Sequence, residues 1–159
     1  MQPAVFFRDI VDPSLKKLTD WTGLVSDDKA RVLVMAIAGQ EGDWQYRRQI
    51  GGPARSYWQF EMGGGVAGLL HVTSSKLKAV CAALDVPFYG PDIFEAMAWN
   101  DTLACCMARL LLWSDYRPLP FLGDQPGGWQ YYVQNWRPGM PHPDRWPKCY
   151  GTAMSFVKP

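Results

Sequence analysis

Only three of the 15 acidic residues are glutamates, namely Glu41, Glu61 and Glu95, although Glu is a good helix former and is normally common on helical surfaces. Glu41 follows an apolar helical stripe and precedes Gly42, so we expect it at the C-terminal end of a helix. The negative end of the helix dipole disfavours an ionised carboxylate there, and burial beside Trp44 would disfavour it further. A carboxyl group that keeps its proton near neutral pH can act as a general acid, which is the role predicted for Glu41. The alternative is a solvated acid at a surface helix end.

Gln59 and Glu61 follow Glu41 by 18 and 20 residues, in the glycine-bounded segment 51–65, which does not read as a helix. Residues 57–61 favour a short extended segment, and such an insert facing a helix end makes the second wall of a cleft. We therefore expect Gln59 to be a substrate-contacting amide and Glu61 a second catalytic carboxylate. The alternatives are a structural amide that holds the loop and an exposed acid.

Side chains alternate between the two faces of an extended segment. On this basis we expect Tyr57, Gln59 and Glu61 to face the cleft, and Trp58 and Phe60 to point into the core. Sugar rings stack on aromatic faces, so aromatic residues in this window indicate a carbohydrate ligand.

Together these residues resemble the catalytic core of the lysozyme-like superfamily, nearest to the soluble lytic transglycosylases and goose-type lysozymes. In those proteins a helix ends in Glu-Ser, and Gly-Leu-Met-Gln follows at the spacing that separates Glu41 from Gln59 here. Residues 36–65 also resemble small lysozyme-like proteins of bacteriophages, which often carry a later Trp-Arg-Pro-Gly segment, matched at 136–139. The chain departs from the pattern at Gly42, where the family has Ser, and at Tyr57-Trp58, where it has Leu-Met.

The resemblance implies a mainly α, lysozyme-like α+β fold in which a helical bundle surrounds a central helix and a small irregular or β-like insert lines the cleft. It implies one catalytic domain over residues 1–159, acting on the β-1,4 bond between N-acetylmuramic acid and N-acetylglucosamine without a metal or cofactor. Glu41 would protonate the glycosidic oxygen. If Glu61 holds a water or stabilises the cation, the product is hydrolysed. Otherwise Glu41 returns as base and the muramyl C6 hydroxyl attacks, which gives a 1,6-anhydro sugar.

Two further substrate-binding residues follow from the resemblance. Arg55 is expected to contact a muramyl carboxylate or a peptide stem, with a surface role as the alternative. The transglycosylases carry a later Tyr-Asn pair whose tyrosine hydrogen-bonds the catalytic Glu, and its nearest match is Tyr132 or Tyr131 with Asn135. The alternative for Tyr132 is core packing, because the aromatic residues of segment 129–136 share one helix face.

The elements that must position these residues are mostly helical. Apolar periodicity, caps and Pro or Gly stops predict helices at 14–21 (capped by Ser14), at 27–42 after Ser26, at 73–84, at 101–113 after Asn100 or Asp101, at 128–136 and at 145–157. Asp92 and Glu95 read as a capping box at the start of another helix. Pro and Gly in 137–143 exclude a helix there.

Length and composition exclude several classes of protein. The 159 residues and 18.0 kDa fit one domain, and 48% apolar residues exclude a disordered chain. A net charge of +1 argues against a nucleic-acid-binding module, and no apolar run is long enough for a membrane span. The four cysteines form no CxxC pair, so we expect no zinc site, free thiols and folding in a reducing cytoplasm.

The resemblance implies peptidoglycan strands as the partner and, in one alternative, other phage virion proteins. Residues 1–8 show no secretory signal, so the expected locations are the host cytoplasm before lysis or the phage particle, with action on the bacterial cell wall. Two rival functions remain open. One is a non-catalytic tail or baseplate protein that keeps a lysozyme-like fold, and the other is a glycan-binding module that uses the aromatic residues alone.

Overall fold

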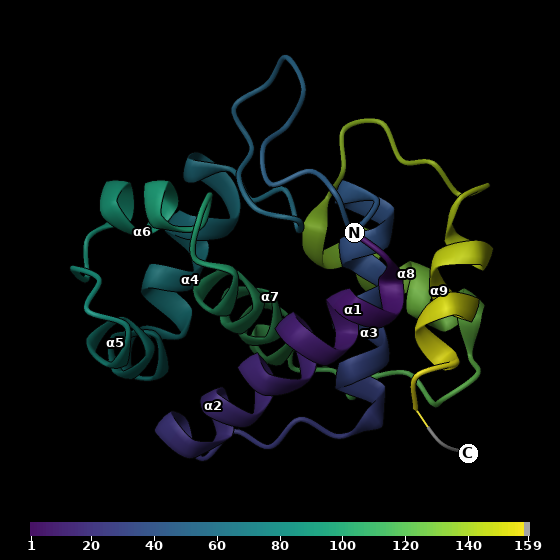
Figure 1. Ribbon diagram of the computed structural model, residues 1–159, viewed down its shortest axis with the longest axis horizontal. Helices are drawn as coiled ribbons and strands as arrows, with labels where there is room; N and C mark the ends of the chain where they lie inside the picture. Colours follow the sequence, from purple (N-terminus) through teal and green to yellow (C-terminus); the bar gives the residue numbers. More distant parts are fainter. Residues whose placement is uncertain (158–159) are drawn as a thin grey trace.

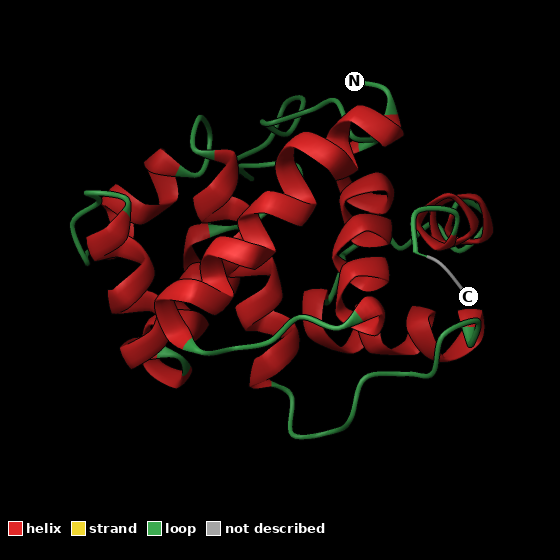
Figure 2. Ribbon diagram, turned by 60° about the horizontal axis from the view of Figure 1, so that its bottom comes forward, coloured by secondary structure: helices red, strands yellow, loops and turns green. Residues whose placement is uncertain are grey.

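Helices dominate the computed structural model, which describes residues 1–157 (Figures 1 and 2). The predicted mainly α class is therefore confirmed. Within the described residues the only strand-like pairing is two isolated bridges, Arg48 with Arg55 and Arg55 with Phe60. In chain order the helices are α1 (Pro3–Phe6), the π-helical turn η1 (Phe7–Val11), α2 (Asp12–Thr22), α3 (Asp28–Gly42), the π-helical turn η2 (Met62–Val66), α4 (Ala67–Val72), α5 (Ser74–Ala83), α6 (Gly90–Ala96), α7 (Asp101–Ser114), α8 (Gln125–Trp136) and α9 (Trp146–Met154).

The N-terminal helix is longer than the sequence predicted. It runs from Pro3 to Thr22 through α1, η1 and α2, whereas the expected helix covered only 14–21. Pro13 has no N–H to donate to the helix. The π-helical turn that ends at Val11 changes the hydrogen-bond pattern just before the proline, so the helix continues through it. The predicted stop is correct, because Gly23 ends α2 with φ 74°, a left-handed conformation that suits glycine.

Helix α3 is the central element of the fold. Its residues from Val32 to Gln40 are all buried, and it packs against α9, α7, α8 and η1 (Figure 1). The capping residue is Asp27, whose carboxylate accepts the Ala30 N–H at 3.0 Å, and not Ser26 as predicted. A helix buried on every side needs apolar residues all around, which explains why its stripe is so wide.

Most other helices lie close to their predicted positions. Asn100 caps α7 through the Leu103 N–H at 2.9 Å, and α8 begins three residues earlier than predicted, at Gln125. The capping box at α6 is wrong. No side chain caps that helix, and Glu95 instead forms an ion pair with Arg55 at 3.7 Å.

One contiguous apolar core draws residues from every helix. All four cysteines lie in it and are free, as predicted. Burial raises the pKa of Cys81 to about 11 and that of Cys106 to about 12, so these thiols stay protonated at neutral pH. No helix within the described residues is long and apolar enough to cross a membrane.

Candidate active site

The chain leaves α3 sharply and returns as an irregular insert over residues 43–61. Asp43 and Trp44 both have positive φ (49° and 53°), which turns the backbone away from the helix axis. Mutual backbone hydrogen bonds between Arg55 and Phe60, at 2.9 and 2.8 Å, then close a tight turn over 56–59. Because Ser56 (φ 68°) and Gln59 (φ 51°) are left-handed, this turn is not an extended segment.

The turn overturns the predicted orientation of Tyr57. Side chains do not alternate around a turn, and both Tyr57 and Trp58 point into the core, 1% and 0% exposed. Tyr57 packs edge-on against Phe6 at 4.8 Å between ring centroids and does not line the cleft. Phe60 is buried as predicted, but it also belongs to the cleft lining.

Two indole groups fasten the insert to its neighbours. The Trp58 indole donates to the Val34 carbonyl of α3 at 2.8 Å, and the Trp136 indole of α8 donates to the Trp58 carbonyl at 2.9 Å. Gly42 lets the insert lie directly on the end of α3, because a Cβ there would come within 2.6 Å of the Tyr57 carbonyl oxygen. This close approach explains why the residue after Glu41 is glycine.

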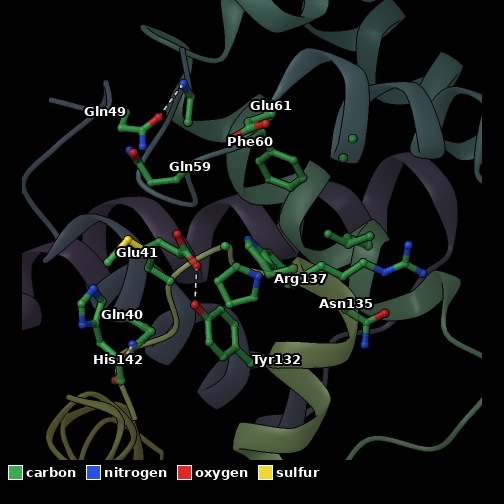
Figure 3. Close-up of a pocket in the computed structure, with 18 of the residues that line it drawn as sticks. Gln40, Glu41, Gln49, Gln59, Phe60, Glu61, Tyr132, Asn135, Arg137 and His142 are labelled. Atoms are coloured by element: carbon green, nitrogen blue, oxygen red, sulfur yellow. Dashed lines mark hydrogen bonds between the residues drawn. The ribbon is translucent and has the colours of Figure 1, made fainter. Parts of the chain in front are cut away.

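The insert, the end of α3 and the far side formed by α8 and residues 137–145 enclose a cleft of about 1190 Å³. Glycines 63, 64, 65 and 68 form another part of its lining and leave it unobstructed. Figure 3 shows Glu41 between two ends of the lining, with Gln40 and His142 on one side and Asn135 and Arg137 on the other. A cleft that extends on both sides of a carboxyl group suits a chain-like ligand.

Glu41 is held at the centre of this cleft by Tyr132. The Tyr132 hydroxyl donates to Glu41 Oε1 at 2.5 Å (Figure 3). Burial raises the pKa of Glu41 above its ordinary value, and this outweighs the opposite effects of the Tyr132 hydroxyl and the Arg145 guanidinium. Burial and the neighbouring carboxyl also raise the pKa of Tyr132, so its hydroxyl remains a donor.

The Tyr132 ring is itself fixed by aromatic packing. It stacks on Trp146 with centroids 5.4 Å apart and an interplanar angle of 10°, and it contacts Trp129 at 5.3 Å. Both expectations for Tyr132 therefore describe part of its role, because its ring is in the core while its hydroxyl reaches Glu41. The hydroxyl contact is the one that the resemblance assigns to a tyrosine of the family.

Sequence reasoning missed three residues around the end of α3. Arg145 donates to the Gly39 carbonyl at 3.2 Å, and the Gln40 amide donates to the His142 carbonyl at 2.9 Å. These bonds tie the segment 137–145 to the end of α3. No local pattern could have found them, because each pair is separated by more than a hundred positions.

The other predicted site residues divide into two groups. Gln59 and Glu61 line the wall opposite Glu41, as Figure 3 shows. The Gln59 amide donates to the Ser56 and Tyr46 carbonyls at 2.7 and 3.3 Å, which fixes the side chain. The Gln59 amide therefore holds the turn in place. Because Gln59 also lines the cleft, contact with a substrate stays a prediction.

Arg55 does not reach the cleft. Its guanidinium lies 5.0 Å from the centroid of the Phe94 ring and 3.7 Å from Glu95, so its charge is already engaged. Within the described residues no group of three or more His, Cys, Asp or Glu side chains is placed to hold a metal ion.

We predict that Tyr132→Phe moves the alkaline limb of the pH–rate profile to higher pH. The hydroxyl stabilises the ionised form of Glu41 and so lowers its pKa, and its loss leaves that pKa higher. A general acid with a higher pKa keeps its proton to higher pH, so activity persists further into the alkaline range. The measurement is kcat/KM against pH on peptidoglycan strands, the substrate that the resemblance leads us to expect.

Tyr131→Phe is the matched control. Its hydroxyl donates to the Leu112 and Arg117 carbonyls and not to the cleft, so this variant should leave the alkaline limb in place. A shift of the limb to lower pH in Tyr132→Phe would contradict the assigned electrostatics.

No protein-family model, curated protein or solved structure matches this chain. The chemistry of this chain is therefore inferred from the cleft itself, that is, from Glu41, its tyrosine partner and the residues on the opposite wall.

Proposed function

We propose that the protein is a peptidoglycan-cleaving glycosidase that breaks the β-1,4 bond between N-acetylmuramic acid and N-acetylglucosamine. One observation carries this proposal: a partly buried carboxyl group with a raised pKa, hydrogen-bonded by a tyrosine, in a cleft whose lining extends on both sides of it. That arrangement suits a general acid acting on a polymer. The resemblance to phage lysozyme-like proteins supports the same substrate.

In the first step, protonated Glu41 donates to the glycosidic oxygen, and the bond from that oxygen to the muramyl C1 breaks. The sugar passes through an oxocarbenium-like state, and Glu41 becomes a carboxylate. The Tyr132 hydroxyl, already donating to Oε1, then stabilises the new negative charge. The partly buried Trp136 ring, on the cleft lining, offers an apolar face to the sugar.

In the second step, the Glu41 carboxylate removes the proton of the muramyl C6 hydroxyl as its oxygen bonds to C1. This closes the 1,6-anhydro ring and restores the protonated acid. A water activated by Glu61 would instead give a reducing-end sugar. We favour the first route, because Gln59 matches enzymes that use one essential Glu, and because the Glu61 side chain is exposed and makes no hydrogen bond or ion pair among the described residues.

The decisive experiment is mass spectrometry of the muropeptides released from purified sacculi. Anhydro-muropeptides support the transglycosylase route, and reducing-end muramic acid supports hydrolysis. Sacculi that release no fragments, yet bind the protein, would favour a glycan-binding module. Neither release nor binding, together with co-purification with phage particles, would favour a virion structural protein.

Glu61→Gln tests the choice between the two routes. We predict that Glu61→Gln changes the cleavage rate less than ~10-fold, a much smaller loss than that of Glu41→Gln. The reason is that the Glu61 side chain supplies no positioned acid or base in the favoured route. The products should still carry the anhydro ring. Equal losses from both substitutions, with reducing-end products, would make Glu61 a catalytic partner.

A further inference from the structure

Arginines inside and outside the cleft differ in how their charge is used. Outside it, every arginine of the described residues is engaged by an acid or by polar atoms: Arg8 with Asp9, Arg31 with Asp12 and Asp28, Arg47 with Asp101, Arg55 with Glu95, Arg117 with Asp115, and Arg109 with Ser26 and the Val25 carbonyl. The three that line the cleft, Arg48, Arg137 and Arg145, form no ion pair within the described residues, although Arg145 lies near enough to Glu41 to lower its pKa.

Two of these three have no function in the mechanism above. Arg145 is half-buried, bonds the Gly39 carbonyl and acts on Glu41. Arg48 and Arg137, here called the cleft arginines, are exposed and make no side-chain hydrogen bond within the described residues. Arg48 belongs to the insert, and Arg137 follows α8 on the other wall and extends beside Asn135 (Figure 3).

We propose that the cleft arginines bind carboxylates of the peptide stems carried by the muramyl residues of the substrate, an inference that rests on the proposed function. A guanidinium presents a planar fork of donors that matches a carboxylate in two parallel hydrogen bonds. Uncharged glycans such as chitin offer no such group. The role expected for Arg55 therefore passes to Arg48 and Arg137, which together make the cleft selective for stem-bearing strands.

Both the peptide stems and the lactyl groups of the muramyl residues carry carboxylates. Three ligands distinguish which of these two sources the arginines bind. The first is glycan strands that carry their stems. The second is the same strands after amidase treatment, which leaves only the lactyl carboxylate on each muramyl residue. The third is chitin oligosaccharides, which carry none. Binding is measured with Glu41→Gln protein so that no strand is cleaved.

Arg48→Gln and Arg137→Gln, each in that background, should weaken binding of stem-bearing strands about tenfold, the scale of one lost charged hydrogen bond. They should leave binding of trimmed strands and of chitin unchanged. Arg→Lys should recover only part of the loss, because the charge returns without the fork. Lys16→Gln removes the same charge at an exposed position outside the cleft and should change nothing.

Equal binding of the three ligands, or variants that bind stem-bearing strands as the parent does, would overturn the proposal. An equal loss on trimmed strands would also overturn it and assign the arginines to the lactyl carboxylate. These outcomes differ from failure of the proposed function, in which the wild-type protein cleaves no strand of any kind.

Discussion

Glu41→Gln is expected to lower the rate of glycan cleavage by at least ~10²-fold, the usual scale for a positioned general acid, while the fold is retained. The amide has nearly the same shape as the carboxyl group and still accepts the Tyr132 hydroxyl, so the contact seen at Oε1 survives. It cannot deliver a proton to the glycosidic oxygen. The measurement is kcat/KM on solubilised strands, with circular dichroism to check the fold.

Glu95→Gln is the matched control, because it makes the same substitution outside the cleft and should leave the rate unchanged. Near-wild-type cleavage by Glu41→Gln would remove the basis of the whole active-site assignment. Substrate binding should survive in Glu41→Gln, which makes this variant usable for the binding experiments.

The same substitution should stabilise the protein at neutral pH. The folded-state pKa of Glu41 is raised, so the wild type loses stability as pH rises from the unfolded-state pKa of Glu through the folded value. Gln does not titrate. The Tm of Glu41→Gln should therefore exceed that of the wild type at pH 7.5, and the difference should shrink as the pH falls towards about 4, the unfolded-state pKa of Glu, and level off below it. A constant difference across this range would contradict the burial argument.

The sequence predicted the parts of the site that depend on local pattern. An apolar stripe followed by Gly42 places Glu41 at a helix end, and in the structure α3 does end at Gly42. The spacing to Gln59 places the opposite wall, because glycines and a proline leave the insert no regular alternative. Both are short-range arguments, in which the residue type directly limits the backbone.

The errors arose where an interaction partner is distant in sequence. A period of two places Tyr57 in the cleft, and this fails because Ser56 and Gln59 take left-handed conformations that form a turn. Local spacing makes Glu95 part of a helix cap, but its partner in the fold is Arg55, which lies 40 positions earlier. Arg145 gave no signal, since its effect on Glu41 depends on how α9 packs against α3.

The largest effect on stability is expected from Trp58→Ala. The Trp58 ring is fully buried, its indole donates to the Val34 carbonyl in the middle of α3, and its own carbonyl accepts the Trp136 indole. Truncating a buried Trp to Ala typically costs about 3–5 kcal/mol through lost burial and the cavity that remains. This is a large part of the roughly 5–15 kcal/mol that stabilises an ordinary domain.

Trp58→Phe separates packing from positioning, because it keeps most of the apolar contact and loses only the indole donor and part of the ring. We expect it to remain folded, with a smaller loss of stability. Its cleavage rate should still fall, since the indole bond sets the insert, and with it Gln59, against α3. Trp99→Phe is the control, because the Trp99 side chain is 69% exposed and lies outside the cleft. Urea unfolding measures the free energy of unfolding of each variant. An average substitution costs about 1 kcal/mol. A Trp58→Ala protein that loses no more than this would mean that the Trp58 side chain does not hold the insert against α3.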